Sequence, residues 1–193
     1  MTDDNARETF PEEDDTASGD EASGAPGDEV AAALVEEFDT AVFHDSHGQP
    51  VVYLDPADWL AAATFLRDEQ QFTQCVDVTA VDHLTDETRL VVEGVEPLRF
   101  EVVANFLSHE RNRRIRTIAE LPADNPSVAS LTAVFPGVNF AEREAYDMFG
   151  VVFEDHPDLT RLLMPDDWAG HPLRKDDAPS YVPVTFKEDP APR

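Results

Sequence analysis

The acidic side chains of the segment EREAYDMFG, residues 142–150, are of a type and spacing that could do chemistry. Glu142, Glu144 and Asp147 fall close together on any helix there, and His156 and His171 follow, each before a proline. Carboxylates and histidines can transfer protons or bind a metal ion. No nucleophile–base pair, Gly-rich phosphate loop or His-Glu-x-x-His spacing accompanies them. Two interpretations therefore stand: a free-standing carboxylate/His metal hydrolase, or a capped helix whose charges pair with its own arm.

The helix that would carry these carboxylates has start and stop signals of its own. Asn139 followed by Glu142 matches the spacing of a capping box, with Asn as the cap. Gly150 is placed to end the helix in a left-handed conformation. The sequence thus predicts one short helix over residues 140–149.

Ion pairs are expected on this helix and after it. Arg143 and Asp147 are four residues apart and can pair on one helix face. In the later segment PLRKDD, Arg174 and Lys175 are expected to pair with Asp176 or with a carboxylate of a partner protein. His156 and His171, each in a loop, are more commonly hydrogen-bonded structural residues than metal ligands.

Charge and cysteine content exclude several classes of function. The chain has 193 residues, with 41 Asp and Glu against 14 Lys and Arg, a formal net charge of −27. Unaided binding to nucleic acid phosphates is therefore not expected. Cys75 is the single cysteine, so the chain has no internal disulfide and no cysteine-ligated iron–sulfur cluster of its own. No apolar run is long enough to span a bilayer, so a cytosolic chain that reaches a membrane only through partners is expected.

Three regions differ in composition. Residues 1–29 are acidic, with Ser, Gly, Ala, Thr and Pro, and are predicted to be disordered. Residues 30–155 carry the apolar periodicity of a folded domain. Residues 156–193 are rich in proline and are predicted to form an extended arm that lies on something else.

Within the domain, both helical and strand patterns occur. VAAALVEEF from Val30 is compatible with a short helix, and VVYL at 51–54 indicates a strand. In DPADWLAAATFLRDEQ, Asp55 is predicted to cap a helix with Pro56 at its first position. The segment NPSVASLTAVFP predicts another short helix, capped by Ser127 and ended by Pro136.

Three segments with period-two alternation predict an antiparallel meander with one buried face. Their inward residues are Val76, Val78, Ala80; Leu98, Phe100, Val102, Ala104, Phe106; and Ile115, Thr117, Ala119, Leu121. RLVV at 89–92 fits either a short extra strand or a loop. The predicted fold class is α+β: a small mixed or antiparallel sheet with helices on one face, followed by the proline-rich arm.

A basic cluster interrupts the acidic sequence. HERNRRIR places Arg111, Arg113, Arg114 and Arg116 at a connection between strands. A solvated hairpin tip is the usual setting for such a run. Our hypothesis is that the cluster contacts an acidic partner subunit.

The whole stretch EREAYDMFGVVFEDHPDLTRLLMPDDWAGHPLRKDD resembles the signature of the 30-kDa (C) subunit family of NADH-quinone oxidoreductase, respiratory complex I. Upstream, VDVTAVDH, FEVVANFL and VASLTAVFPGVNF look like the family's sheet and the approach to its signature helix, so the resemblance covers roughly residues 30–186. A close variant is the equivalent subunit of an F420H2 dehydrogenase or a membrane-bound hydrogenase.

The resemblance implies a hydrophilic structural subunit of the peripheral arm, with no catalytic centre, cofactor or metal of its own. FMN, iron–sulfur clusters and quinone would be bound by partner subunits of the proton-translocating enzyme. The partners implied are complex I subunits D, B and I, of which D carries the quinone site. Together they would form a hetero-oligomeric complex on the cytoplasmic side of a bacterial membrane.

The resemblance also implies which residues pack against partners. On the helix these are Glu142, Arg143, Glu144, Tyr146, Asp147, Phe149 and Gly150. On the arm they are His156, Pro157, Arg161, Trp168, Gly170, His171, Pro172, Leu173, Arg174, Lys175 and Asp176. The chain departs from the family pattern at Thr160 and Asp177, where a basic and an aromatic residue are usual, and keeps only Tyr181 of a usual Gly-Tyr pair.

Overall fold

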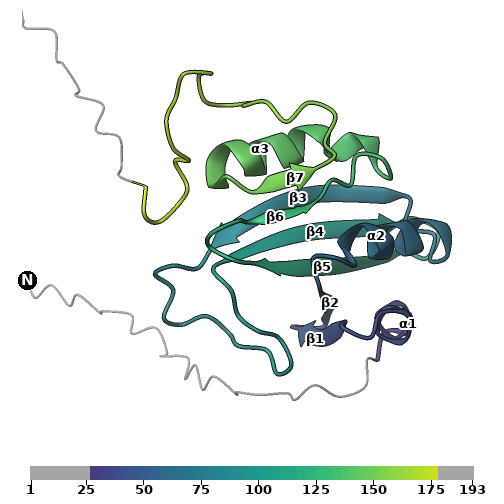
Figure 1. Cartoon of the computed structure of the whole chain (residues 1–193). Coiled ribbons are helices and arrows are strands. Elements are labelled where there is room, and N and C mark those ends of the chain that lie inside the picture. Colours follow the sequence, from purple (N-terminus) through teal and green to yellow (C-terminus); the bar gives the residue numbers. More distant parts are fainter. Residues whose placement is uncertain (1–26, 178–193) are drawn as a thin grey trace, which may run out of the picture.

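The computed structural model describes residues 27–177, and Figure 1 shows their arrangement. The helices are α1 (Glu29–Glu37), α2 (Trp59–Asp68) and α3 (Asn139–Phe149), and a 3₁₀ helix spans Pro136–Val138. The strands are β1 (Val42–Ser46), β2 (Gln49–Leu54), β3 (Gln74–Asp82), β4 (Phe100–Ser108), β5 (Arg113–Leu121), β6 (Ser127–Ala129) and β7 (Val152–Glu154). Most of the predicted disordered leader and the end of the predicted arm lie outside the described residues.

A five-stranded mixed sheet in the order β1-β2-β5-β4-β3 forms the centre of the fold. Strands β3, β4 and β5 are the antiparallel meander that alternation predicts. Strand β2 pairs parallel with β5, and β1 pairs antiparallel with β2. The β1–β2 hairpin turns at His47 and Gly48, whose φ angles are 53° and 76°, as a tight two-residue hairpin turn requires.

One face of this sheet carries the hydrophobic core, and all three helices contribute to it. Leu34 of α1, Trp59 of α2 and Ala145 of α3 are buried in the same cluster as Phe100 and Phe106 of β4. The predicted α+β class, with helices on one face of a small mixed sheet, is therefore confirmed. None of the helices within residues 27–177 is long and apolar enough to cross a membrane.

An Asp caps the first helix, whereas the Asp predicted to cap the second one does not. The Asp28 carboxylate accepts hydrogen bonds from the N–H groups of Val30 and Ala31, so α1 starts at Glu29, within the stretch predicted to be disordered. The predicted start of α2 is wrong. The Asp55 carboxylate accepts from the N–H of Ala57 and forms a turn, and the helix begins only at Trp59.

The predicted helix in NPSVASLTAVFP is also wrong. Ser127–Ala129 is strand β6, which pairs parallel with β7, and Val128 is buried opposite Phe153. Pro136 begins the 3₁₀ helix and does not end a longer one. Pairing with a strand that lies later in the sequence outweighs the local helix signals.

Two details of the meander differ from simple alternation. The register shifts between Cys75 and Asp77, so Val76 is 50% exposed although Val78 and Ala80 are buried as predicted. Such a bulge turns one side chain to the other face. RLVV at 89–92 belongs to the loop between β3 and β4 and forms no strand.

Candidate functional site

The candidate site is α3 together with the arm, residues 156–177, which lies along it (Figure 1). The geometry begins with Glu142, whose side chain is fully buried. Its carboxylate accepts hydrogen bonds from Ser130 Oγ at 2.6 Å and from the N–H of Leu131 at 2.7 Å. Glu142 thus fixes α3 to the segment that follows β6.

This contact replaces the capping box that the sequence predicts. Asn139 has helical angles, φ −46° and ψ −50°, and is the first residue of α3 and not its cap. Glu142 points to Ser130 and Leu131 and not back to the helix start. Burial raises the pKa of Glu142 to about 6, because the Ser130 hydroxyl and the Leu131 N–H only partly oppose it.

Asp147 holds the arm in place. Its buried carboxylate contacts the Arg161 guanidinium at 2.6 Å. It also accepts the N–H groups of Leu162, Leu163 and Met164 at 2.7–3.0 Å. Burial alone would raise its pKa, but the Met164 N–H, Arg161 and the other N–H groups hold the pKa of Asp147 at about 2.

Arg143 does not pair with Asp147, so that prediction is wrong. Its guanidinium donates to the backbone carbonyls of Thr160 and Arg161, each at 3.0 Å. A more favourable set of donors for Asp147 exists on the arm, where one guanidinium and three N–H groups converge. The interpretation of a helix whose charges bind its own arm describes this geometry.

The arm also satisfies the carbonyl groups that the end of α3 leaves without partners. His171 Nδ1 lies 3.0 Å from the Asp147 carbonyl oxygen, and the Leu173 N–H donates to the Met148 carbonyl at 3.0 Å. Arg174 Nε donates to the Phe149 carbonyl at 2.5 Å. The last turn of a helix needs such donors, and here a distant segment supplies them.

Gly150 makes this approach possible. Its φ is 72°, the left-handed end predicted from the sequence. A Cβ at this position would stand 2.6 Å from His171 Cδ2 and 2.7 Å from Arg174 Nη2. Only glycine therefore fits both the backbone turn and the packing of the arm.

A second attachment joins the arm to the sheet. Buried Asp82 at the end of β3 pairs with Arg99, which also pairs with Asp176 at 2.5 Å. The Lys175 N–H donates to Asp82 at 2.9 Å. Of the two predicted partners of Arg174 and Lys175, Asp176 is wrong, because it pairs with Arg99 and Arg174 donates to carbonyls. A carboxylate of a partner protein stays a prediction.

His156 has a structural hydrogen-bonding role. Its side chain is enclosed, Nδ1 accepts the Asp158 N–H at 3.0 Å, and Nε2 faces the Asn139 carbonyl oxygen at 3.3 Å. Within residues 27–177, no three His, Cys, Asp or Glu side chains are grouped so that they could hold a metal ion. Glu144 is exposed on the outer side of α3.

The structure brings most of the predicted helix and arm residues into one cluster and leaves others on its outer side. Tyr146 packs edge-on to His171 with ring centroids 6.0 Å apart, and Phe149 and Trp168 are half-buried. The outward residues are Glu144, Pro157, Gly170, Pro172, Leu173, Lys175 and Asp176. Sequence reasoning missed the residues outside the signature that complete the cluster, namely Asp82, Arg99, Ser130 and Leu131. The one signal for Asp82 is a charged residue in a buried position of an alternating strand.

Comparisons with known proteins agree on one family. A family model described as "Respiratory-chain NADH dehydrogenase, 30 Kd subunit" matches residues 52–181. The C subunit of NADH-quinone oxidoreductase from Salinispora tropica is 39% identical over 83% of this chain and 64% of the relative, so the chain spans just under two thirds of that protein. The corresponding protein of Herpetosiphon aurantiacus is also 39% identical, over 78% of this chain and 83% of the relative.

Two solved structures share the fold. The trypsin-resistant fragment of Nqo5 has a TM-score of 0.59 and 27% identity, covering 67% of this chain and 99% of the fragment. A chain of the membrane-bound sulfane sulfur reductase, an archaeal respiratory membrane complex, has a TM-score of 0.62 and 20% identity, covering 83% of this chain and 95% of that one. The second likeness concerns the fold alone.

Proposed function

Because this chain belongs to the 30-kDa subunit family of respiratory-chain NADH dehydrogenase, we propose that it is a structural subunit in the peripheral arm of a proton-translocating NADH:quinone oxidoreductase. Electrons would pass from NADH to quinone through FMN and iron–sulfur clusters held by partner subunits. The proposed neighbours are subunits D, B and I, on the cytoplasmic side of the membrane. The chain's own contribution would be to hold these neighbours in fixed positions.

The observation that supports this proposal is that the two buried carboxylates of α3 bind other groups of this same chain. Glu142 binds the segment after β6 and so fixes α3 there, and Asp147 binds the arm and so fixes its path. A carboxylate with all its hydrogen bonds made inside a scaffold is placed to position other groups and not to meet a substrate. The charged side chains of the signature thus determine how α3 and the arm pack together.

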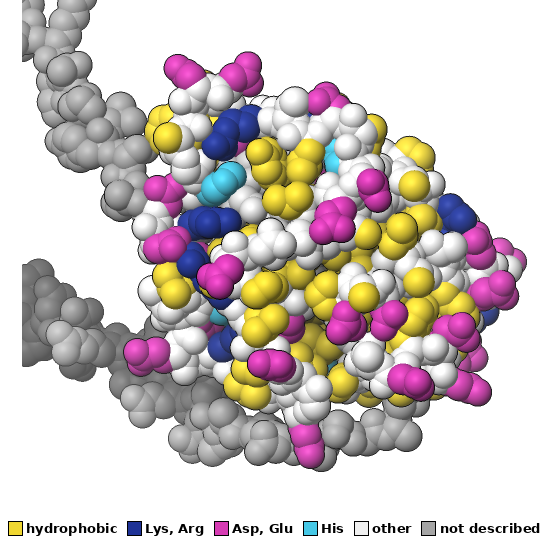
Figure 2. Space-filling view, in the orientation of Figure 1, with side chains coloured by type: hydrophobic (Ala, Val, Ile, Leu, Met, Phe, Trp, Pro, Cys, Tyr) yellow, Lys and Arg dark blue, Asp and Glu magenta, His cyan; other side chains and the backbone are white. Residues whose placement is uncertain are grey.

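This packing leaves several apolar side chains of α3 and the arm exposed. Phe140 on α3 and Leu163 and Leu173 on the arm are 61%, 60% and 48% exposed. In Figure 2, hydrophobic side chains lie among Lys, Arg and His in the upper part of the molecule, where Figure 1 places α3 and the arm. Exposed apolar groups rimmed by polar residues are typical of protein–protein contacts.

A structural subunit supports electron transfer by keeping the distances between redox groups of its partners fixed. Redox groups and substrates must be held within about 0.5 Å of their working geometry by rigid surroundings. An arm bound at both Asp147 and Asp82 is such a rigid element. A looser arm would lower the turnover of the NADH:quinone reaction, although every ligand of the redox centres would stay in place.

The proposal is tested by purifying the C-terminally tagged chain from gently solubilised membranes, identifying co-purified proteins by mass spectrometry and assaying NADH:quinone activity. We expect subunits B, D and I and inhibitor-sensitive NADH oxidation. Recovery of the chain alone, away from the membrane fraction, would contradict the proposal.

Two matched variants locate the contact. In the first, Leu163→Asp and Leu173→Asp place charge on the outer side of the arm. In the second, Leu90→Asp and Val91→Asp do the same in the β3–β4 loop, where the side chains are 62% and 64% exposed. We expect the arm variant to lose co-purified subunits at least tenfold and the loop variant to retain them. Equal retention in both would show that the arm is not the contact.

A further inference from the structure

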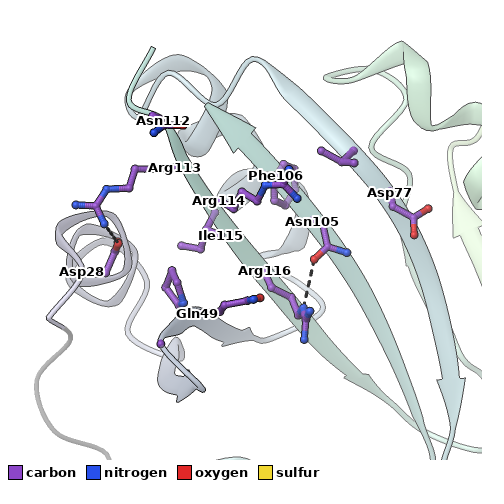
Figure 3. Close-up of a pocket in the computed structure, with 13 residues that line it drawn as sticks. Asp28, Gln49, Asp77, Asn105, Phe106, Asn112, Arg113, Arg114, Ile115 and Arg116 are labelled. Carbon is purple, nitrogen blue, oxygen red and sulfur yellow. Dashed lines mark hydrogen bonds and ion pairs between the residues drawn. The ribbon is translucent and has the colours of Figure 1, made fainter. Parts of the chain in front are cut away.

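A basic hollow lies beside the β4–β5 hairpin, on the sheet face opposite the core (Figure 3). Its volume is about 570 Å³. The polar and charged side chains of its lining are Asp28, Gln49, Asp77, Asn105, Asn112, Arg113, Arg114 and Arg116. The hollow is open to solvent.

Two ion pairs hold the start of α1 at the rim of this hollow. Arg113 pairs with Asp28 at 3.2 Å, and Arg111 pairs with Glu29 at 3.1 Å. Of the four arginines predicted at the hairpin tip, Arg111 lies in the β4–β5 turn, and the others lie on β5. Two of these arginines bind acidic residues of this same chain.

The remaining two arginines lie further along β5. Arg116 Nε donates to Asn105 Oδ1, a neutral acceptor, at 3.2 Å. Among residues 27–177, no carboxylate lies within ion-pairing distance of Arg114 or Arg116. Figure 3 shows both arginines on β5 and Asp77, which also lines the hollow, on β3, where it makes no ion pair with either of them. Within residues 27–177, the lining thus has two arginines without an ion pair against one such carboxylate, Asp77, so its charge is positive on balance.

The chain itself delivers a matching segment to this place. The 26 residues before Gly27 include the run EEDD at 12–15 and carry one basic residue, Arg7. They join the described structure next to Asp28, which lines the hollow. Asp15 and Asp28 are 13 residues apart, a reach of up to roughly 43 Å at about 3.3 Å per residue.

We propose that the acidic leader, residues 1–26, docks in this basic hollow of its own chain, with EEDD against Arg114 and Arg116. Covalent attachment gives the leader an effective concentration on the order of millimolar at the hollow. The rest of the chain is strongly acidic and repels it. An acidic segment of a partner subunit would have to displace the leader to reach the same arginines.

The test places a nitroxide spin label in the leader of the full chain. Ser18→Cys is labelled in a Cys75→Ser background, which removes the only native cysteine. Amide signal intensities are compared with those of the reduced label at about 0.1 M salt. We expect signals of Arg114 and Arg116 to fall by at least half and those of β7, on the far side of the sheet in Figure 1, to remain unchanged.

Reversing the charge of the two arginines distinguishes a leader that docks in the hollow from one that is only tethered near it. In Arg114→Glu/Arg116→Glu the β5 signals should recover to the level of β7. A control with the same change in net charge, Arg67→Glu/Lys175→Glu, should keep the loss. Rising salt should also restore the signals in the parent protein, which needs no variant to fold.

Two results would overturn the proposal. One is the absence of selective broadening at β5 in the full chain, which would leave the hollow to an acidic segment of another subunit. The other is broadening that persists unchanged in the Arg114/Arg116 reversal. Neither result depends on the assembly proposed above, since the measurement is made on the chain alone.

Discussion

Two buried carboxylates of α3, Glu142 and Asp147, show how hydrogen-bond partners decide a pKa. Burial raises the pKa of both. Asp147 has one guanidinium and three N–H groups, and its pKa is held at about 2. Glu142 has one hydroxyl and one N–H, and its pKa rises to about 6. Stability that depends on Asp147 is present above its usual pKa and is lost as the pH falls through about 2.

The sign is opposite for Glu142, and this gives a prediction for Glu142→Gln. A carboxyl whose pKa is raised by folding stabilises the folded chain below pH 4.5, and this contribution is lost as the pH rises through about 6. We expect the free energy of unfolding of the parent, relative to Glu142→Gln, to fall by on the order of 1–2 kcal/mol between pH 4.5 and 7. Urea unfolding at several pH values measures it.

A control on the same helix is Glu144→Gln. Glu144 is exposed, so its replacement should leave the pH dependence of the parent unchanged. A Glu142→Gln variant with the same pH dependence as the parent would show that this carboxyl does not titrate in that range.

At the scale of elements, the arm acts as the missing cap of α3. The His171 ring, the Leu173 N–H and Arg174 bind three successive carbonyls at the helix end. The helix and the arm should therefore lose order together, although the arm contains no helix or strand among residues 156–177.

Gly150→Ala tests this coupling, with Gly48→Ala as its match. Both glycines have positive φ, 72° and 76°, but a Cβ at Gly48 meets nothing within 4 Å. Backbone strain alone costs roughly 1–2 kcal/mol at either site. We expect Gly150→Ala to lose more, and to lose hydrogen-exchange protection at the Leu173 N–H. Retained protection at Leu173 would mean that the arm tolerates the added methyl group.

A helix or strand of this chain can be predicted from the sequence when the residues that determine it lie close to it along the chain. The β3–β4–β5 meander and the end of α3 at Gly150 follow from local alternation and local turn chemistry. Strand β6 does not, because only β7 makes it a strand. The ion pairs are predicted worst: Asp147 binds Arg161 and not Arg143, because a set of arm donors that no spacing reveals surrounds it.

At the scale of the whole molecule, charge is the dominant feature. The net charge is −27, and Figure 2 shows Asp and Glu spread over the visible face. Like charges at this density oppose the compact state. Exposed ion pairs such as Arg113–Asp28 contribute only about 0–1 kcal/mol each, so their screening matters less.

Salt should therefore stabilise this chain. Between 0.1 and 1 M KCl the screening length falls from about 10 to about 3 Å. We expect an increase of at least about 1 kcal/mol in stability, or about 2–4 °C in Tm, measured by thermal unfolding. A variant with Glu36, Glu37, Glu69 and Glu110, all exposed, replaced by Gln should show a smaller rise. A Tm that falls with KCl would show that ion pairs outweigh repulsion.

The parallel pairing of β2 with β5 determines the order in which this chain can fold during synthesis. Val51 meets Arg116 only after α2, β3 and β4 have been made. At about 5–20 residues per second, the β1–β2 hairpin waits several seconds on the ribosome with Val51 uncovered, because its cluster partners Val103 and Ile118 lie on β4 and β5. A chaperone that binds nascent chains would find its substrate in this interval, and the wait ends when β5 leaves the exit tunnel.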